Sequence, residues 1–454
     1  MNPKSRSLTE GPITKSIIAF SVPILLSNLF QQLYNSIDTA VVGTYAGSAS
    51  LAAVGSTAAL INLLIGFFLG IATGTGVLYA MYYGAGQYDR LKRLINSALF
   101  IAVSAGLFIS ILGIIFARQL LIMMDTPDDV IGLSERYLRI YLSGTVVNMI
   151  YNVAAGMIRA EGDSKGPLIY LVIGGVSNLV LDLFFVAVLN TGVDGAALAT
   201  VIAQAISAVL CVIRLLKMPE QYRFRFSAIS IDAQTCRELV RVSVPCGLQS
   251  SMFNISNLLV QAKINGFGSV AMAGIAAYGK IDGFVYMPMM AVSLAVSTYV
   301  GQNVGAGKYD RVRKGIRVCL LLAGALSVTM GSAVVLFADS ILNLFTSDPE
   351  VKSIALRMMW FMAPFAWVFT FSDILGGAIR GAGETMKVTI ITALCICVFR
   401  VVWLIVMLKV FYDIRVVCIC YPISWTLCSI VMLIYYFKSP VMKKALRPRE
   451  SEYI

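Results

Sequence analysis

The sequence contains no histidine, and only 13% of its residues are charged. It has nine cysteines but no Cys-x-x-Cys pair, and the spacing of Cys395/Cys397 and Cys418/Cys420 points the members of each pair to different faces of a helix. A zinc or redox site is therefore not expected, because such sites need histidine or closely paired thiolates. We expect the cysteines to be small buried residues and the protein to use no cofactor.

Hydrophobic residues make up 58% of the 454 residues. Many apolar runs exceed the ~20 residues that a helix needs to span a bilayer, which indicates a polytopic α-helical membrane protein. A soluble protein of this composition would need a very large core with almost no polar surface. The N-terminus lacks the short apolar region and small-residue cleavage site of a signal peptide, so no removal of a leader is expected. Twelve spans are expected, at 14–43, 51–82, 94–116, 135–157, 167–189, 195–216, 238–264, 271–303, 315–338, 353–379, 388–410 and 414–437.

The basic residues gather in alternate loops. The N-terminus, the loops near 90, 160, 214–241, 308–317 and 380, and the C-terminal tail hold 26 of the 36 lysines and arginines. The intervening loops hold seven and carry several acids. Because lysine and arginine crowd the cytoplasmic side of membrane proteins, both termini are expected in the cytoplasm of a cell with the protein in its plasma or inner membrane. The net charge of +12 is thus a signal of topology.

One run, Tyr222–Phe226, alternates aromatic and basic residues, a pattern that can indicate RNA binding. A single run at a membrane face is more often a tether whose rings lie among the lipid headgroups. Since the chain shows no folded basic domain, nucleic acid is not expected as a partner.

The chain repeats itself at a spacing of 221–222 residues. Ser21-Val22-Pro23 recurs at 243–245, Gly84–Arg90 recurs at 305–311 with six of seven residues identical, and Ile158-Arg159 recurs at 379–380. Six spans in each half make the repeats parallel, related by a pseudo-two-fold axis along the membrane normal. We expect an all-α membrane protein of twelve transmembrane helices in two six-helix repeats around a central cleft. The predicted domains are an N-terminal lobe (1–216), a cytoplasmic linker (217–237), a C-terminal lobe (238–437) and a cytoplasmic tail (438–454).

The first span carries an acid, Asp38, deep inside. Gln31, Tyr34 and Asn35 precede it by seven, four and three residues, offsets that place the polar groups on one face of a helix. A charge within the bilayer costs roughly 2.5–3.5 kcal/mol even on insertion scales, so such a residue usually faces a cavity and indicates a functional site. The structural alternative is a polar contact between helices.

A second acid, Asp182, lies in the fifth span. It is eight residues from Asn190 at the expected outer end, and Asp38 is seven from Tyr45, so both acids are expected ~10–12 Å from the outer surface. Asn178 shares a helix face with Asp182. Two carboxyl groups at one depth can share a proton, which burial and like charge both favour, or can hold a small cation such as Na⁺. Four further charged residues within spans are secondary candidates: Lys280, Asp282, Asp373 and Arg400.

The two six-helix repeats, the opening run SVPILLSNLFQQLYNSIDTAVVG, the twin GAGxYDR loops and the twin IRxxG[DE] loops resemble the MATE (multidrug and toxic compound extrusion) family over essentially the whole chain. The resemblance implies an antiporter that exchanges protons or sodium for organic drugs. It implies that Asp38 and Asp182 are the family's coupling acids, and that five residues form the polar network around them: Tyr34, Tyr137, Asn152, Asn178 and Thr200. The sodium-coupled branch has an acid in the seventh helix, where this chain has Phe253 and Asn254, so the chain is more similar to the proton-linked members.

The expected function is therefore secondary active efflux of organic, mostly cationic compounds in exchange for protons by alternating access. A sodium-coupled drug antiporter and a related lipid or oligosaccharide flippase are the alternatives; a flippase for phosphate headgroups would need a more basic cavity than Lys280 and Arg400 provide. An enzyme is not expected, since the chain lacks histidine and paired metal motifs. The expected partners are drug-like small molecules and the lipid bilayer, with the protein a monomer.

Overall fold

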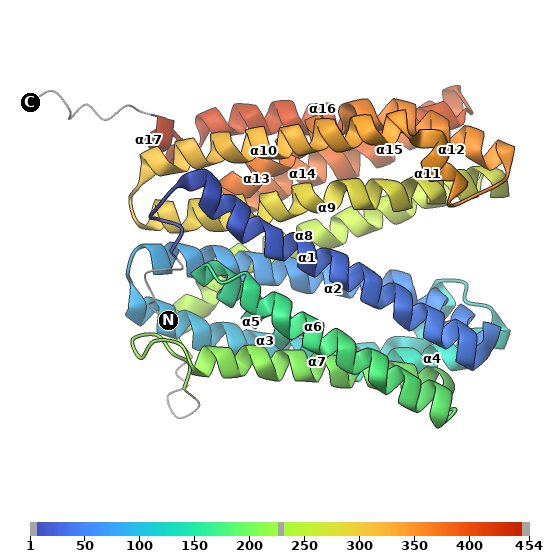
Figure 1. Ribbon diagram of the computed structural model, residues 1–454, viewed down its shortest axis with the longest axis horizontal. Coiled ribbons are helices and arrows are strands. Elements are labelled where there is room, and N and C mark those ends of the chain that lie inside the picture. The colour runs from blue at the N-terminus through green and yellow to red at the C-terminus, as the bar shows by residue number, and fades with distance from the viewer. Residues whose placement is uncertain (1–6, 226–230, 447–454) are drawn as a thin grey trace, which may run out of the picture. The chain divides into compact units, whose positions relative to one another are not determined.

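The computed structural model describes residues 7–225 and 231–446. Over these residues the chain is helical and contains no strand (Figure 1). The first half comprises α1 (Ile13–Val41), η2 (Val42–Ala46), α2 (Gly47–Gly84), α3 (Tyr88–Met123), α4 (Asp128–Ser143), α5 (Thr145–Glu161), α6 (Lys165–Asp182), η3 (Leu183–Val188) and α7 (Gly192–Leu216). The second comprises α8 (Ala233–Asn265), α9 (Ser269–Gly305), α10 (Tyr309–Leu336), α11 (Ala338–Asn343), α12 (Pro349–Met362), η5 (Ala363–Phe365), α13 (Ala366–Gly381), α14 (Thr385–Thr392), η6 (Ala393–Val398), α15 (Phe399–Val410), α16 (Ile414–Lys438) and α17 (Pro440–Leu446). Five residues of the segments discussed above lie outside the described residues: Lys4 and Arg6 of the basic N-terminus, Arg447 and Arg449 of the basic tail, and Phe226 of the aromatic and basic run.

All twelve predicted spans are helical. Nine stretches of the described chain are long and apolar enough to cross a membrane, and one of them, Ile13–Gly84, contains two spans, α1 and α2. The two remaining spans are not among these stretches. The fourth span is divided into α4 and α5, each of which is too short to cross a membrane alone, and α8 is not apolar enough. The chain is an all-α membrane protein of twelve transmembrane helices in two six-helix repeats.

The division within the fourth span falls at Gly144. A side chain there would place its Cβ 2.6 Å from Cγ2 of Val201, so only glycine permits this close approach to α7. The break ends α4 at Ser143 and lets α5 begin at Thr145, which corrects the single helix expected over 135–157.

The described chain packs as two compact units. Unit 1 contains residues 1–7 and 26–247, and unit 2 contains residues 8–25 and 248–454, in each case as far as they are described. The boundaries fall inside α1 and α8, two residues after Pro23 and Pro245. These two units are defined by packing. The lobes predicted above, 1–216 and 238–437, were defined by the sequence repeat and stay a prediction.

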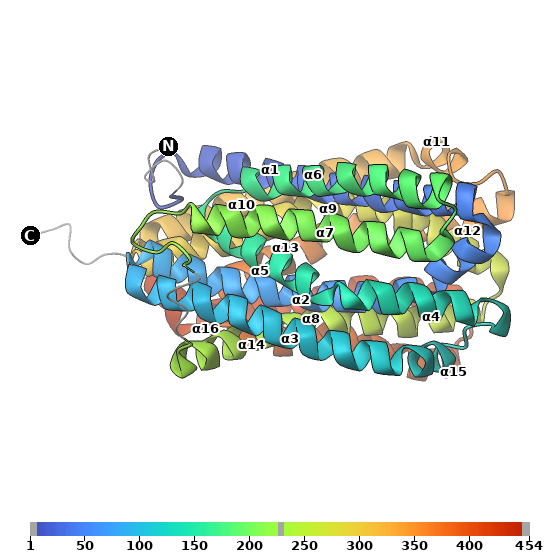
Figure 2. The ribbon, with the colours of Figure 1, turned by 90° about the horizontal axis from the view of Figure 1, so that it is seen from below.

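Unit 1 has its core among α2, α3, α5 and α7, where Tyr79, Leu94 and Met157 are fully buried. Helices α6 and α7 lie side by side, as Figures 1 and 2 show. Small residues permit the close packing that holds membrane helices together. At Gly74 a Cβ atom would lie 2.4 Å from Cα of Ser243, and at Gly70 it would lie 2.3 Å from the carbonyl oxygen of Cys246. The start of α8 therefore packs directly on α2 at these two glycines.

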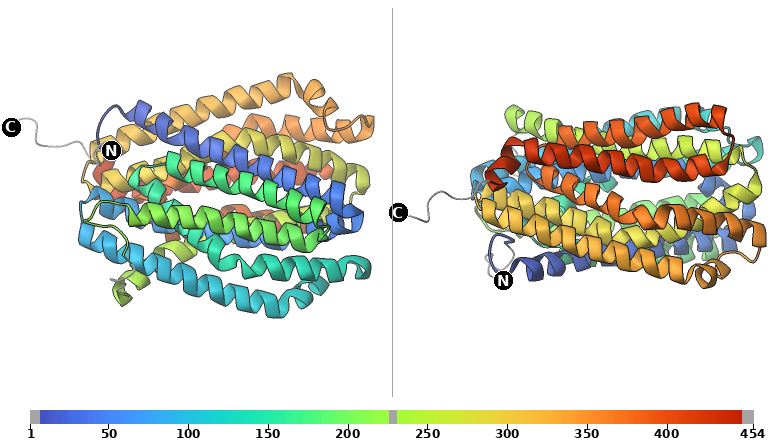
Figure 3. Two further views of the ribbon diagram at one scale, coloured as in Figure 1. Left: turned by 60° about the horizontal axis from the view of Figure 1, so that its bottom comes forward. Right: turned by 90° about the horizontal axis from the view of Figure 1, so that it is seen from above.

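Unit 2 has its core among α9, α10, α13 and α16, with Tyr299, Ile374 and Met432 buried in it. Figure 3 shows the long helix α16, in red, from two further sides. The first part of α1 belongs to the same core through Ile17 and Phe20. The backbone before α1 is held by the 302–311 region: Gln302 accepts a hydrogen bond from the Leu8 amide at 2.8 Å.

Candidate functional site

Asp182 is the most deeply placed carboxyl group of unit 1, with 0% of the residue exposed. It is the last residue of α6, and the wider π-helical turn η3 begins at the next residue. Such turns in membrane and soluble helices alike are frequent at functional sites, because they re-aim side chains. In the amide orientation that satisfies both of its ends, the Asn178 side chain donates to Oδ2 of Asp182 at 2.8 Å and accepts from the Thr200 amide at 3.2 Å. The predicted i, i+4 pairing of Asn178 with Asp182 is thus present.

Asp38 faces Asp182 from α1. The two carboxyl groups lie within hydrogen-bonding reach of each other. Oδ1 of each is buried and has no hydrogen-bond donor among the described residues. Two ionised carboxylates are both acceptors, so this contact needs a proton or a cation between them. No lysine or arginine of the described chain accompanies the pair.

Three tyrosines, Tyr34, Tyr137 and Tyr141, surround the pair. Tyr34, one turn before Asp38, is within hydrogen-bonding reach of Thr200 and interacts electrostatically with both acids. Tyr137 on α4 also interacts with both acids, and its ring stacks on Tyr141 at a centroid distance of 6.4 Å. These phenols supply donors that can bond whichever carboxylate is ionised.

Three residues of this network were missed by the sequence reasoning. Tyr141 is within hydrogen-bonding reach of Asn148 and Gln204, and it interacts with Asp38. Each of the three lies four residues from a predicted member: Tyr141 follows Tyr137, Asn148 precedes Asn152 and Gln204 follows Thr200. A search for polar residues one helical turn from each candidate would have found them.

The other predicted members differ in their placement. Asn152 is buried and donates to the backbone oxygen of Asn148 at 2.9 Å and to its Oδ1 at 2.6 Å, so it joins the network through that residue. Gln31 is half-buried on α1. Asn35 is exposed on α1, three residues before Asp38, and its place in the polar face around that acid stays a prediction.

Unit 2 holds the secondary candidates in two separate groups. Asp282 on α9 accepts a hydrogen bond from the Tyr278 hydroxyl at 3.0 Å. Asp373 on α13 forms an ion pair with Arg380 at 3.5 Å and accepts from Tyr286 at 3.0 Å. Thus Asp282 and Asp373 each accept a tyrosine hydrogen bond, and Asp373 also has a basic partner, which neither Asp38 nor Asp182 has among the described residues.

The two basic candidates of unit 2 have different surroundings. Lys280 is exposed on α9, and no carboxylate of the described residues forms an ion pair with it. Arg400 on α15 is 1% exposed and donates from Nε to the Ser424 hydroxyl at 3.0 Å. Its guanidinium lies 4.3 Å from the centre of the Tyr421 ring.

No group of three or more histidine, cysteine, aspartate or glutamate side chains suited to a metal occurs in the described part of the chain. The Asp38–Asp182 pair can hold one proton, or its carboxylate oxygens can serve as ligands to a single small cation. Both uses need the same two carboxyl groups.

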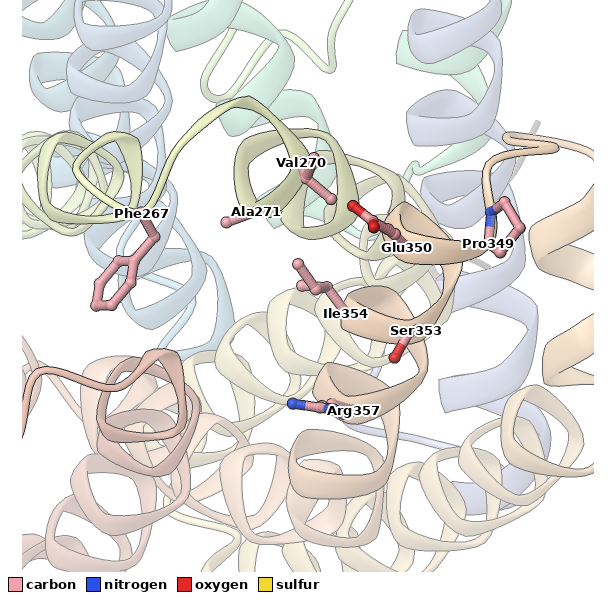
Figure 4. A pocket seen from close by; sticks show the side chains of 8 residues that line it. All are labelled: Phe267, Val270, Ala271, Pro349, Glu350, Ser353, Ile354 and Arg357. Carbon is pink, nitrogen blue, oxygen red and sulfur yellow. The ribbon is translucent and has the colours of Figure 1, made fainter.

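A surface pocket of about 490 Å³ lies elsewhere, in unit 2 (Figure 4). The turn between α8 and α9 and the start of α12 form it, with Phe267 and Ile354 among the apolar side chains and Glu350 and Arg357 among the charged ones. It contains none of the predicted site residues.

The MatE family model matches this chain twice, over residues 23–184 and 245–406. The two matches are displaced by 222 residues, so each half of the chain is one copy of the family's unit. The first match contains both Asp38 and Asp182, and the second contains Asp282, Asp373 and Arg400.

Several curated proteins are similar over most of their length. The chain is 28% identical over 395 residues to the probable multidrug resistance protein YoeA of Bacillus subtilis, covering 86% of this chain and 85% of the relative. It is 26% identical to the probable multidrug resistance protein NorM of Thermotoga maritima, covering 88% and 86%. It is 19% identical to the multidrug export protein MepA of Staphylococcus aureus, covering 85% of each.

Solved structures share the fold. A MATE family transporter in an outward-facing conformation superposes with a TM-score of 0.88 at 22% identity, covering 97% of this chain and 98% of that one. A MATE structure in a bent conformation gives a TM-score of 0.89 at 23% identity over the same shares. With the duplicated family match, the chain belongs to the MatE family, the multidrug and toxic compound extrusion transporters that its sequence resembles, and it is a transporter and not an enzyme.

Proposed function

We propose that the protein exports organic, mostly cationic compounds across the membrane in exchange for protons, and that Asp38 and Asp182 are the coupling site. The observation that carries the proposal is the contact between two carboxyl groups that no basic residue of the described chain accompanies. The names of the relatives, which refer to multidrug resistance and multidrug export, support the substrate class.

The exchange follows from the charge of the pair. When the pair holds its proton, its attraction for a bound organic cation is weak, so the cation leaves. When the proton departs, the ionised pair attracts the next cation, and Tyr34 and Asn178 bond the ionised oxygens. Because each ligand changes the affinity for the other, alternating exposure of the pair to the two sides of the membrane couples the two fluxes.

In this proposal the protein works as a monomer, in which one chain supplies both acids together with Asn178 and Thr200. Basic residues of the described loops, such as Arg90, Arg93, Lys308 and Arg311, lie on the side that we assign to the cytoplasm. Both termini are then cytoplasmic, and the protein lies in the plasma or inner membrane.

Counterflow in proteoliposomes tests the proposal. Substrate export should respond to an imposed pH gradient and should not respond to an equal sodium gradient. A response to sodium alone would assign the same pair to a sodium-coupled antiporter. Transport of lipid-linked substrates with no response to either gradient would favour the flippase.

A further inference from the structure

The second GAGxYDR loop, residues 305–311, bonds the backbone that precedes α1, which we call the strap (residues 8–11). The guanidinium of Arg311 donates from Nη1 to the Gly11 carbonyl oxygen at 3.0 Å. Its Nη2 donates to the carbonyl oxygens of Leu8 at 3.4 Å and Glu10 at 3.2 Å. A guanidinium presents its donors in a fixed planar fork, so this one side chain can bond several carbonyl oxygens at once.

Three neighbouring side chains bond the same strap. Gln302 accepts a hydrogen bond from the Leu8 amide at 2.8 Å, and Lys308 donates from Nζ to the Thr9 carbonyl oxygen at 3.0 Å. Asn303 donates to the Leu8 carbonyl oxygen at 3.3 Å, while its Oδ1 accepts from Nε of the loop arginine at 3.3 Å and so orients the guanidinium. All of these bonds to the strap go to its main chain, so the loop recognises the course of the backbone rather than the side chains.

The strap is not helical, so its buried backbone groups need partners from elsewhere in the protein. Leu8 belongs to the core of unit 2, and Thr9 is only 8% exposed. Gly11 has a φ of +72°, a conformation that favours glycine, and α1 begins two residues later. The bonded strap therefore ties the N-terminal end of α1 to unit 2.

The first GAGxYDR loop is built differently. At the spacing of 221 residues, Arg311 corresponds to Arg90, and Asn303 corresponds to Tyr82. The Arg90 guanidinium lies 6.0 Å from the centre of the Tyr82 ring, and the Tyr82 hydroxyl donates to the Glu238 carboxylate on α8. The first loop is thus linked to the start of α8 through side chains, whereas the second loop bonds the main chain of the strap.

We propose that the second GAGxYDR loop is a main-chain clamp that keeps the strap and the first part of α1, residues 13–25, in unit 2 during exchange, with Arg311 as a positioning residue for that helix. Helix α1 continues without a break from unit 2 into unit 1, where it carries Asp38. If the strap is released, the end of this helix is free to shift, so exchange should slow while the acids themselves stay intact. This effect on exchange rests on the proposed function, whereas the clamp itself does not.

The first test measures how accessible residue 9 is. In a cysteine-free background, Thr9→Cys is labelled with a maleimide in the purified, detergent-solubilised protein. Labelling should be slow while the clamp is closed, and adding Arg311→Gln should raise its rate at least tenfold. Arg311→Lys should raise the rate nearly as much, because an ammonium group lacks the planar fork. The matched control is Arg90→Gln, the same position of the first loop, which should leave the rate unchanged.

Two further variants make this test strict. Glu10→Gln should not change the labelling rate, because the clamp bonds the carbonyl oxygen of Glu10. If Arg311→Gln yields no folded protein, Lys308→Ala removes a single bond from an exposed side chain and should raise the rate several-fold. Unchanged labelling in the Arg311→Gln protein, or in Lys308→Ala where that variant replaces it, would overturn the clamp. An equal rise in Arg90→Gln or in Glu10→Gln would also overturn it.

The second test asks whether the clamp positions α1 for exchange. Arg311→Gln should lower the maximal rate of proton-driven export several-fold, with substrate affinity in detergent and proton release on substrate binding unchanged. A wild-type export rate with a released strap would overturn the positioning role, as would a loss of affinity or of proton release. Because labelling needs no transport, a wild-type protein without gradient-driven export would refute the proposed function and leave the clamp standing.

Discussion

Replacing Asp38 by asparagine removes one of two facing carboxyl groups and keeps the shape of the side chain. Two ionised carboxylates ~4 Å apart repel each other by about 4 kcal/mol at an effective dielectric constant of ~20. This repulsion is what drives the pair to take up a proton. In Asp38→Asn this repulsion is absent, so Asp182 can stay ionised without a proton. Proton uptake then no longer accompanies substrate release, and export driven by a proton gradient should be lost.

The assay is accumulation of a fluorescent organic cation in proteoliposomes under an imposed pH gradient. Coupling energies between two ligands are typically ~1–3 kcal/mol, so we expect gradient-driven accumulation to fall by roughly 5–150-fold. The variant should still fold and bind the cation to some degree, because a neutral amide costs less to bury than a carboxylate. Asp182→Asn should have the same effect.

Asp373→Asn is the matched control, since it neutralises a membrane acid of the other unit that already has Arg380 as its partner. It should reduce the response to the pH gradient much less than Asp38→Asn does. Wild-type accumulation by Asp38→Asn, or equal losses in the two variants, would refute the assignment of the pair.

Three further predictions follow from the described structure. Asn178→Ala removes the amide that bonds Asp182 and should lower the rate of proton-driven export several-fold, with substrate binding in detergent retained. Gly74→Ala places a Cβ 2.4 Å from the backbone of α8 and should lower the melting temperature by several degrees, whereas Gly55→Ala, which meets no atom within 4 Å, should not. In a cysteine-free background, an impermeant maleimide should label Ser347→Cys in intact cells and Gln87→Cys only after lysis; the reverse pattern would overturn the topology.

The Asp38–Asp182 pair could be found from sequence because most of its signals are local. A charge in an apolar span needs no structure to be noticed, and the four-residue spacing of Asn178 and Asp182 follows from helix geometry. The depth of Asp38 and Asp182, counted along two separate helices, predicted that they lie at the same level of the membrane, whereas their contact depends on the packing of α1 beside α6.

The remaining features depend on packing between distant segments. Tyr141, Asn148 and Gln204 resemble many other polar residues until α4, α5 and α7 converge. No local sequence feature predicts that the first and last parts of α1, or of α8, pack in different units. Each helix continues unbroken across the boundary, and only the helices that it packs against differ. Arg400 was noticed as a charge, but its neighbours, the Tyr421 ring and the Ser424 hydroxyl, come from α16 and meet it only when α15 packs on that helix.

The central claim is that Asp38 and Asp182 exchange a proton for the substrate. Proton release on substrate binding measures this directly, with purified protein in weakly buffered detergent solution and a pH indicator dye. The account predicts release of about one proton for each organic cation bound by the wild type, and none by Asp38→Asn. Substrate binding without proton release in the wild type, or equal release by the variant, would contradict it.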